Sequence, residues 1–173
     1  MEQGIVRLGG DEVVLTINGV VDVAELQSLY NQMGWNQNGF LTQPVIRKML
    51  TGSYAFVTAE IDGVLVGFAR VVSDGVCATL IVDVMTHKNF RKRGIASSLM
   101  RFLMNHLDAK VRFSLLVDSS RIGGFYEHFS FMSSNPNLER VMYRDRDRAT
   151  AIQEMTDADH LVGDIGHLKP MAG

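Results

Sequence analysis

Apolar and polar positions follow two different periods along this chain, and the change between them is sharpest near its middle. A nearly continuous apolar run from Ala78 to Met85, with Asp83 as its one charge, is typical of a strand buried on both faces. Apolar residues then recur at helical spacing from Ile95 to Leu103, which predicts an amphipathic helix. A basic turn at residues 88–94 separates the two. The chain therefore places this turn at a helix N-terminus.

A basic, glycine-bearing turn at a helix N-terminus is typical of a phosphate or pyrophosphate site. The first backbone N–H groups of a helix have no partner within it, and the helix dipole adds about half a positive charge there. A Cβ at Gly94 would obstruct contact between the backbone and phosphate oxygens. The alternative is a solvated basic turn ahead of an ordinary helix.

Four further segments upstream of this turn have the composition of strands. Residues 4–8 and 12–17 predict a hairpin, or a frayed segment followed by the first strand of the sheet. Residues 54–57 and 64–71 flank an Asp-Gly turn, which predicts a second hairpin. Three antiparallel strands, including the one that begins at Ala78, are thus expected before the basic turn.

Two helices are predicted between these hairpins. Asp22 and Glu25 match a capping box for the first, which ends near Met33. Pro44 suits the first turn of the second, which runs to about Leu50.

The pattern continues downstream with shorter elements. Residues 111–117 predict a strand, which should lie parallel to its predecessor because a helix connects the two. A helix is expected over residues 122–128, and strands are expected from residue 131 and over 141–143. Residues 145–173 lack sustained periodicity and are interpreted as an extension that is partly disordered or packed on a partner subunit.

Composition restricts the classes of function. A length of 173 residues suits one domain, which we place at residues 1–144, and a formal charge of −2 argues against a general nucleic-acid binder. Cys77 is the only cysteine, which excludes a disulfide or thiolate metal cluster within one chain. The sequence shows neither a signal peptide nor a membrane-spanning run, so a cytoplasmic location is expected.

Two motifs carry a resemblance to a known family. The run Arg91-Lys92-Arg93-Gly94-Ile95-Ala96 fits the pattern Q/R-x-x-G-x-G/A, and the segment GFYEHFSF begins about 30 residues later, at Gly124. In this order and at this separation they resemble the acetyl-CoA loop and a later helix of the GCN5-related N-acetyltransferase (GNAT) family. The resemblance covers about residues 20 to 132.

The resemblance implies both a fold and an activity. The fold would be α+β, with a mixed, mostly antiparallel central sheet of six to seven strands, splayed between its two parallel strands and flanked by about four helices. The activity would be transfer of an acetyl group from acetyl-CoA to a small-molecule or peptide amine by direct attack in a ternary complex. The alternative is a non-catalytic acyl-CoA sensor on the same fold. Many members are dimers, so a homodimer is a further expectation.

The resemblance also implies roles for individual residues. Tyr126 would protonate the departing CoA sulfur, although an aromatic at helical spacing is also typical of a core. Asp83 would activate the amine through water, or else bond only to the backbone at the end of the sheet. Trp35 and Phe40 lie where the acceptor pocket is expected. The implied residues for acetyl-CoA are Val84, Met85, Thr86, Arg91, Lys92, Arg93, Gly94, Ile95, Ala96, Ser97, Ser119 and Phe125.

Three of these assignments have a particular basis. Met85 would act through its backbone N–H, by polarising the thioester carbonyl. Ser119 replaces an asparagine that is common in relatives, and Ala96 replaces a frequent glycine. The five histidines are scattered without metal-ligand spacing, so no metal is expected.

Overall fold

A single mixed sheet forms the centre of the computed structural model, which describes residues 2–108, 111–117, 123–133 and 141–145. The strands follow the order β1-β2-β3-β4-β5-β6-β8-β7. Their bounds are β1 Glu2–Leu8, β2 Asp11–Ile17, β3 Ala55–Ile61, β4 Val64–Ser73, β5 Ala78–Thr86, β6 Phe113–Val117, β7 Met132–Ser133 and β8 Val141–Asp145. All neighbours pair antiparallel except β5 and β6, which are parallel.

The expected fold class is therefore confirmed, and the described residues form eight strands where six to seven were expected. At the N-terminus, β1 pairs with β2 along its full length and so forms the predicted hairpin. Of the extension expected at residues 145–173, Asp145 belongs to the domain as the last residue of β8, and residues 146–173 lie outside the described residues.

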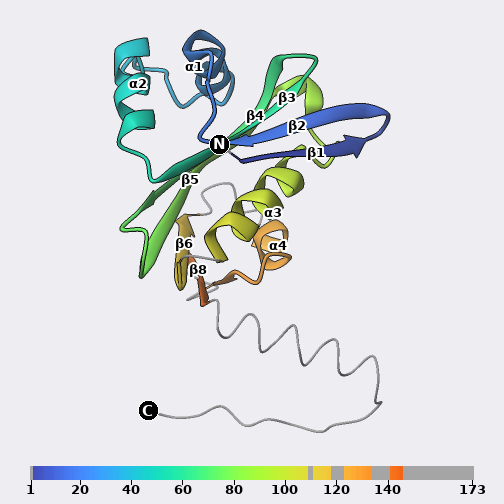
Figure 1. Cartoon of the computed structure of the whole chain (residues 1–173). Helices are drawn as coiled ribbons and strands as arrows, with labels where there is room; N and C mark the ends of the chain where they lie inside the picture. The colour runs from blue at the N-terminus through green and yellow to red at the C-terminus, as the bar shows by residue number, and fades with distance from the viewer. Residues whose placement is uncertain (1, 109–110, 118–122, 134–140, 146–173) are drawn as a thin grey trace, which may run out of the picture.

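Four α-helices cover the two faces of the sheet. They are α1 Val23–Gln32, α2 Gln43–Thr51, α3 Ile95–Asp108 and α4 Gly123–Glu127. Figure 1 shows α1 and α2 on one side of the sheet and α3 and α4 on the other. Two apolar clusters match these layers: one includes Leu26 and Ile46 from α1 and α2, and the other includes Leu99 and Leu103 from α3.

The predicted cap of α1 is only half present. The Asp22 side chain accepts hydrogen bonds from the backbone N–H groups of Ala24 and Glu25, as an N-cap should. The Glu25 carboxylate does not close a capping box, because it accepts a hydrogen bond from the backbone N–H of Leu65 at 3.0 Å. Glu25 thus ties α1 to the start of β4, a long-range contact that local sequence does not reveal.

Two irregularities in β5 shape the centre of the sheet. Its parallel pairing with β6 covers Ala78–Ile81 and stops close to the end of β6 at Val117, whereas β5 continues to Thr86. Its register with β4 shifts between Phe68 and Arg70, and Asp83 has a left-handed φ of 57°. The second half of β5 therefore bulges and extends past the described pairing with β6.

Gly67 allows α3 to pack closely on the sheet. A Cβ at this position in β4 would lie 2.8 Å from Leu99 Cδ1 and 2.9 Å from Ile95 Cγ2, and both contacts are too short for carbon atoms. The N-terminal half of α3 thus rests directly on the backbone of β4.

We predict that Gly67→Ala destabilises the protein by about 1–3 kcal/mol, because the added methyl group overpacks this contact. Thermal unfolding should show a melting temperature lower by about 2–4 °C per kcal/mol. Gly124→Ala in α4 is the control, since a Cβ there meets nothing within 4 Å. Equal melting temperatures for the two variants would contradict this account of the packing.

Candidate active site

A pocket of about 650 Å³ lies between the end of α1, the second half of β5, the start of α3 and α4. Eleven of the residues singled out from the sequence line it. They are Trp35, Val84, Thr86, Arg91, Lys92, Gly94, Ile95, Ala96, Ser97, Phe125 and Tyr126. Met33 and Phe90 also line it, and sequence reasoning missed them because neither belongs to a motif.

The floor of the pocket at α3 has the geometry of an anion site. The first intrahelical bond described runs from the Ser98 N–H to the Gly94 carbonyl at 3.0 Å. The N–H groups of Ile95, Ala96 and Ser97 therefore precede the bonded turns of a helix of 14 residues, at its positive end.

Glycine is required at position 94 by backbone conformation. Its φ is +86°, in the left-handed region that residues with a Cβ rarely adopt. A Cβ there would lie 3.4 Å from Leu8 Cδ2, which is an ordinary contact, so the protein itself leaves room for one. The expected clash with phosphate oxygens stays a prediction.

The three basic side chains of the turn differ in their surroundings. Arg91 Nε donates to the Thr86 carbonyl at 3.4 Å, and its Nη2 approaches Met33 Sδ at 3.6 Å, which holds Arg91 on the pocket wall. Lys92 lines the pocket with a left-handed φ of 60°. Arg93 is not among the lining residues: it forms an ion pair with Asp11 and stacks over the Phe90 ring.

The surroundings of Tyr126 are compatible with a role as general acid and with a place in the hydrophobic core. It lines the pocket with 8% of its surface exposed, and its ring also packs edge-on against Phe125 and Phe131. The side chain is thus held rigidly by the core cluster while one part of it faces the cleft.

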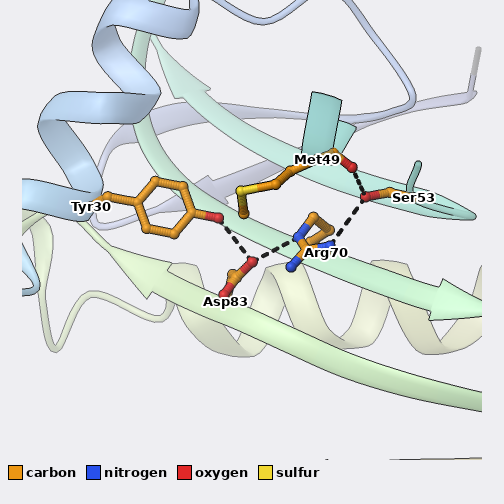
Figure 2. A network of polar contacts seen from close by, with 5 residues as sticks. All are labelled: Tyr30, Met49, Ser53, Arg70 and Asp83. Carbon is orange, nitrogen blue, oxygen red and sulfur yellow. Dashed lines mark hydrogen bonds and ion pairs between the residues drawn. The ribbon is translucent and has the colours of Figure 1, made fainter. Parts of the chain in front are cut away.

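Asp83 is not among the residues that line the pocket, and its contacts differ from the backbone bonds that were the alternative expectation. Arg70 Nε donates to Asp83 Oδ2 at 2.7 Å, and the Tyr30 hydroxyl donates to the same oxygen at 2.8 Å (Figure 2). Its partners are therefore side chains and not the backbone. Both donors bond the same oxygen of Asp83, and its expected role as a base stays a prediction. Sequence alone could not show these contacts, because the partners lie 13 and 53 residues away.

The remaining assignments are placed as follows. Met85 is 1% exposed, so its expected role, which uses only the backbone N–H, stays a prediction. Phe40 is 66% exposed and is not among the lining residues, while Ser119 lies outside the described residues. His128 is exposed, as expected of a surface residue.

A second pocket, of about 530 Å³, adjoins the first, since Ser97 and Phe125 line both. It lies between α3 and α4, and three basic side chains line it: Arg101, His128 and Arg144. Arg101 and Arg144 belong to neither motif of the sequence, and only the fold brings them beside His128 of the GFYEHFSF segment.

Two negative findings apply to the described part of the chain. None of its helices is long and apolar enough to span a membrane. Within the same residues, no group of three or more His, Cys, Asp or Glu side chains is arranged to hold a metal ion.

Comparison with known proteins adds independent evidence. A family model described as an acetyltransferase (GNAT) domain matches residues 52–133, from the end of α2 to β7. An uncharacterized N-acetyltransferase, ycf52, from the alga Gracilaria tenuistipitata var. liui is 27% identical over 138 residues, which cover 76% of this chain and 73% of the relative. GCN5-related N-acetyltransferase 2, chloroplastic, from Arabidopsis thaliana is 25% identical over 162 residues, which cover 83% of this chain and 61% of that protein.

Solved structures share the fold. A probable acetyltransferase of unknown function from meticillin-resistant Staphylococcus aureus superposes with a TM-score of 0.62 at 23% identity and covers 73% of this chain and 94% of its own. The PaiA N-acetyltransferase of Thermoplasma acidophilum, solved in complex with coenzyme A, gives a TM-score of 0.60 at 12% identity, with 76% and 98% covered. Taken together with the mixed sheet and the glycine turn at α3, these matches support the resemblance of the chain to the GNAT family of acetyltransferases.

Proposed function

We propose that this chain transfers an acetyl group from acetyl-CoA to a primary amine bound in the same cleft. The observation that carries the proposal is the pocket itself, which joins the α3 N-terminus, the second half of β5 and the Tyr126 side chain. These features suit the diphosphate, the extended arm and the thioester end of CoA, respectively.

The residues of the pocket would act in the following way. The N–H groups of Ile95, Ala96 and Ser97 bind the diphosphate, with Arg91 and Lys92 adding positive charge beside them. When bound, acetyl-CoA supplies a thioester whose carbonyl carbon forms a bond to the amine nitrogen while its C–S bond breaks. The Tyr126 hydroxyl gives its proton to the departing sulfur. The proton lost from the amine passes to water in the open cleft, without help from Asp83.

The second pocket offers a place for the nucleotide end of the same ligand. Beyond its diphosphate, CoA carries one further strong charge, the 3′-phosphate on the ribose. Arg101, His128 and Arg144 line the space that continues from Ser97, so the charge of the two arginines would favour this phosphate. We therefore propose that CoA extends from the α3 turn into the second pocket.

The central experiment measures free CoA released from acetyl-CoA in the presence of a polyamine, an aminoglycoside, an amino acid or a peptide with a free N-terminus. Release that depends on one of these amines supports the enzyme. Binding of CoA without release from any of them would favour the acyl-CoA sensor.

The first prediction concerns the α3 turn. Gly94→Glu should abolish the thermal stabilisation by CoA, which for the wild-type protein is about 2.7 kcal/mol at 100 times the Kd. The substitution adds bulk and negative charge where the diphosphate is expected. Gly63→Glu is the matched control, because Gly63 also has a left-handed φ, of 77°, and lies in the β3–β4 turn. Equal stabilisation of the two variants would reject the diphosphate site.

The second prediction concerns the general acid. Tyr126→Phe should lower kcat by about 100-fold or more, since proton donation is lost, while the Kd for CoA changes little because the ring remains. Steady-state kinetics and calorimetric titration would measure the two quantities. Tyr54→Phe serves as control, since its ring packs against Gly75 in the β4–β5 turn. A parallel loss of kcat and CoA affinity would reject the acid role.

The third prediction concerns the second pocket. Arg101→Glu should weaken CoA binding by about tenfold, equivalent to 1.4 kcal/mol, through loss of a charge-assisted contact. Binding of 3′-dephospho-CoA should change much less, because it lacks the phosphate in question. Arg47→Glu on α2 controls for net charge. If both ligands weaken equally, the 3′-phosphate lies elsewhere.

A further inference from the structure

A chain of polar contacts joins four elements behind the pocket (Figure 2). Asp83 on β5 accepts hydrogen bonds from Tyr30 on α1 and from Arg70 on β4. Arg70 Nη1 also donates to Ser53 Oγ at 3.5 Å, and the Ser53 hydroxyl donates to the Met49 carbonyl of α2 at 2.6 Å. The array therefore connects both helices that flank the loop carrying Trp35 to one carboxylate on the sheet.

The array lies largely away from water. Tyr30 is 2% exposed, and the side chains of Arg70 and Asp83 are 15% and 18% exposed. Burial, and then the negative charge of Asp83, raise the pKa of the Tyr30 hydroxyl, so this group stays protonated and donates its hydrogen bond at all ordinary pH values. Because charge and hydroxyl are both satisfied, the array resists rearrangement.

Tyr30 is also the residue that holds Trp35. The backbone N–H of Trp35 donates to the backbone carbonyl of Tyr30 at 3.1 Å. The centroids of the two side-chain rings lie 6.5 Å apart, with an angle of 53° between the ring planes. Trp35 in turn lines the pocket, on the side of α1 and opposite the α4 wall that carries Tyr126. A displacement of Tyr30 would thus move a wall of the reaction pocket without touching the α3 turn.

We propose that Asp83 and Arg70 are positioning residues that set the location of Trp35 through Tyr30, and that Trp35 is the part of the wall that selects the amine acceptor. Asp83 acts by holding the Tyr30 hydroxyl and has no part in proton transfer. The selection of the acceptor rests on the proposed acetyl transfer, whereas the control of Trp35 by Asp83 does not.

The left-handed backbone at Asp83 agrees with this role. A non-glycine residue at φ 57° costs free energy, of about 1–3 kcal/mol for such a conformation, unless its surroundings stabilise it. In this bulge the cost is offset by two hydrogen bonds to Asp83 Oδ2, which the regular strand direction would not permit. Asp and Asn are the residues that best tolerate this region.

Trp35 is the only tryptophan of the chain, which allows a test without knowledge of the acceptor. Tyr30→Phe removes one hydroxyl and leaves the ring and the Arg70–Asp83 ion pair in place. Asp83→Asn keeps the left-handed backbone and removes the charge. Trp35 is 45% exposed in the wild-type protein, and its side chain would become more accessible to solvent once Tyr30 is displaced. In both variants, acrylamide quenching of the tryptophan fluorescence should therefore increase by up to about twofold. Tyr54→Phe should show wild-type quenching.

Kinetics then separate positioning from catalysis. With the amine identified by the CoA-release assay, both variants should raise the KM for the amine about tenfold, while kcat and the Kd for CoA stay within about threefold. Unchanged quenching in both variants would overturn the proposal. So would a loss of kcat of about 100-fold in Asp83→Asn with the acidic limb of its pH profile removed, since a base loses activity when it is protonated and that result would make Asp83 the base. The quenching result stands whether or not any amine is acetylated, so failure of the proposed activity is recognised separately.

Discussion

The extension of β5 past its pairing with β6 is the constraint on which the rest of the site depends. The two parallel strands are bonded over Ala78–Ile81, β6 ends at Val117, and β5 continues for five more residues, to Thr86. An unpaired strand edge inside a cleft can accept a ligand that carries its own amide groups. Because α3 begins where this edge ends, the same opening leads directly to the positive end of a helix dipole.

Neighbouring residues of β5 face different surroundings. Val84 faces the pocket, whereas Asp83, one residue earlier, is turned toward Arg70 and Tyr30 on the side of α1 and α2. Successive residues of a strand point to opposite faces, and the bulge adds the left-handed φ at Asp83. Asp and Asn are the residues that best tolerate this conformation, which agrees with a carboxylate at this point of an apolar strand.

The β1–β2 hairpin contributes to the same site although it lies outside the family match at residues 52–133. Asp11 pairs with Arg93, and Leu8 lies beside Gly94, so the tip of the hairpin lies against the basic turn. A carboxylate near an anion site reduces the local positive charge. Arg91 and Lys92 are therefore the basic side chains that remain along the pocket wall.

Local sequence determined the elements, the glycine turn and the set of residues around it, because helix and strand periods, capping signals and a left-handed glycine are properties of short segments. The surroundings of Asp83, Glu25 and Arg93 came only from the tertiary structure. Each of these charges is bound by a group far along the chain. Arg93 pairs with Asp11, Asp83 is bound by Tyr30, and Glu25 is bound by the backbone N–H of Leu65. A charge in a sequence shows that a partner is needed, but only the folded chain decides which partner lies within reach.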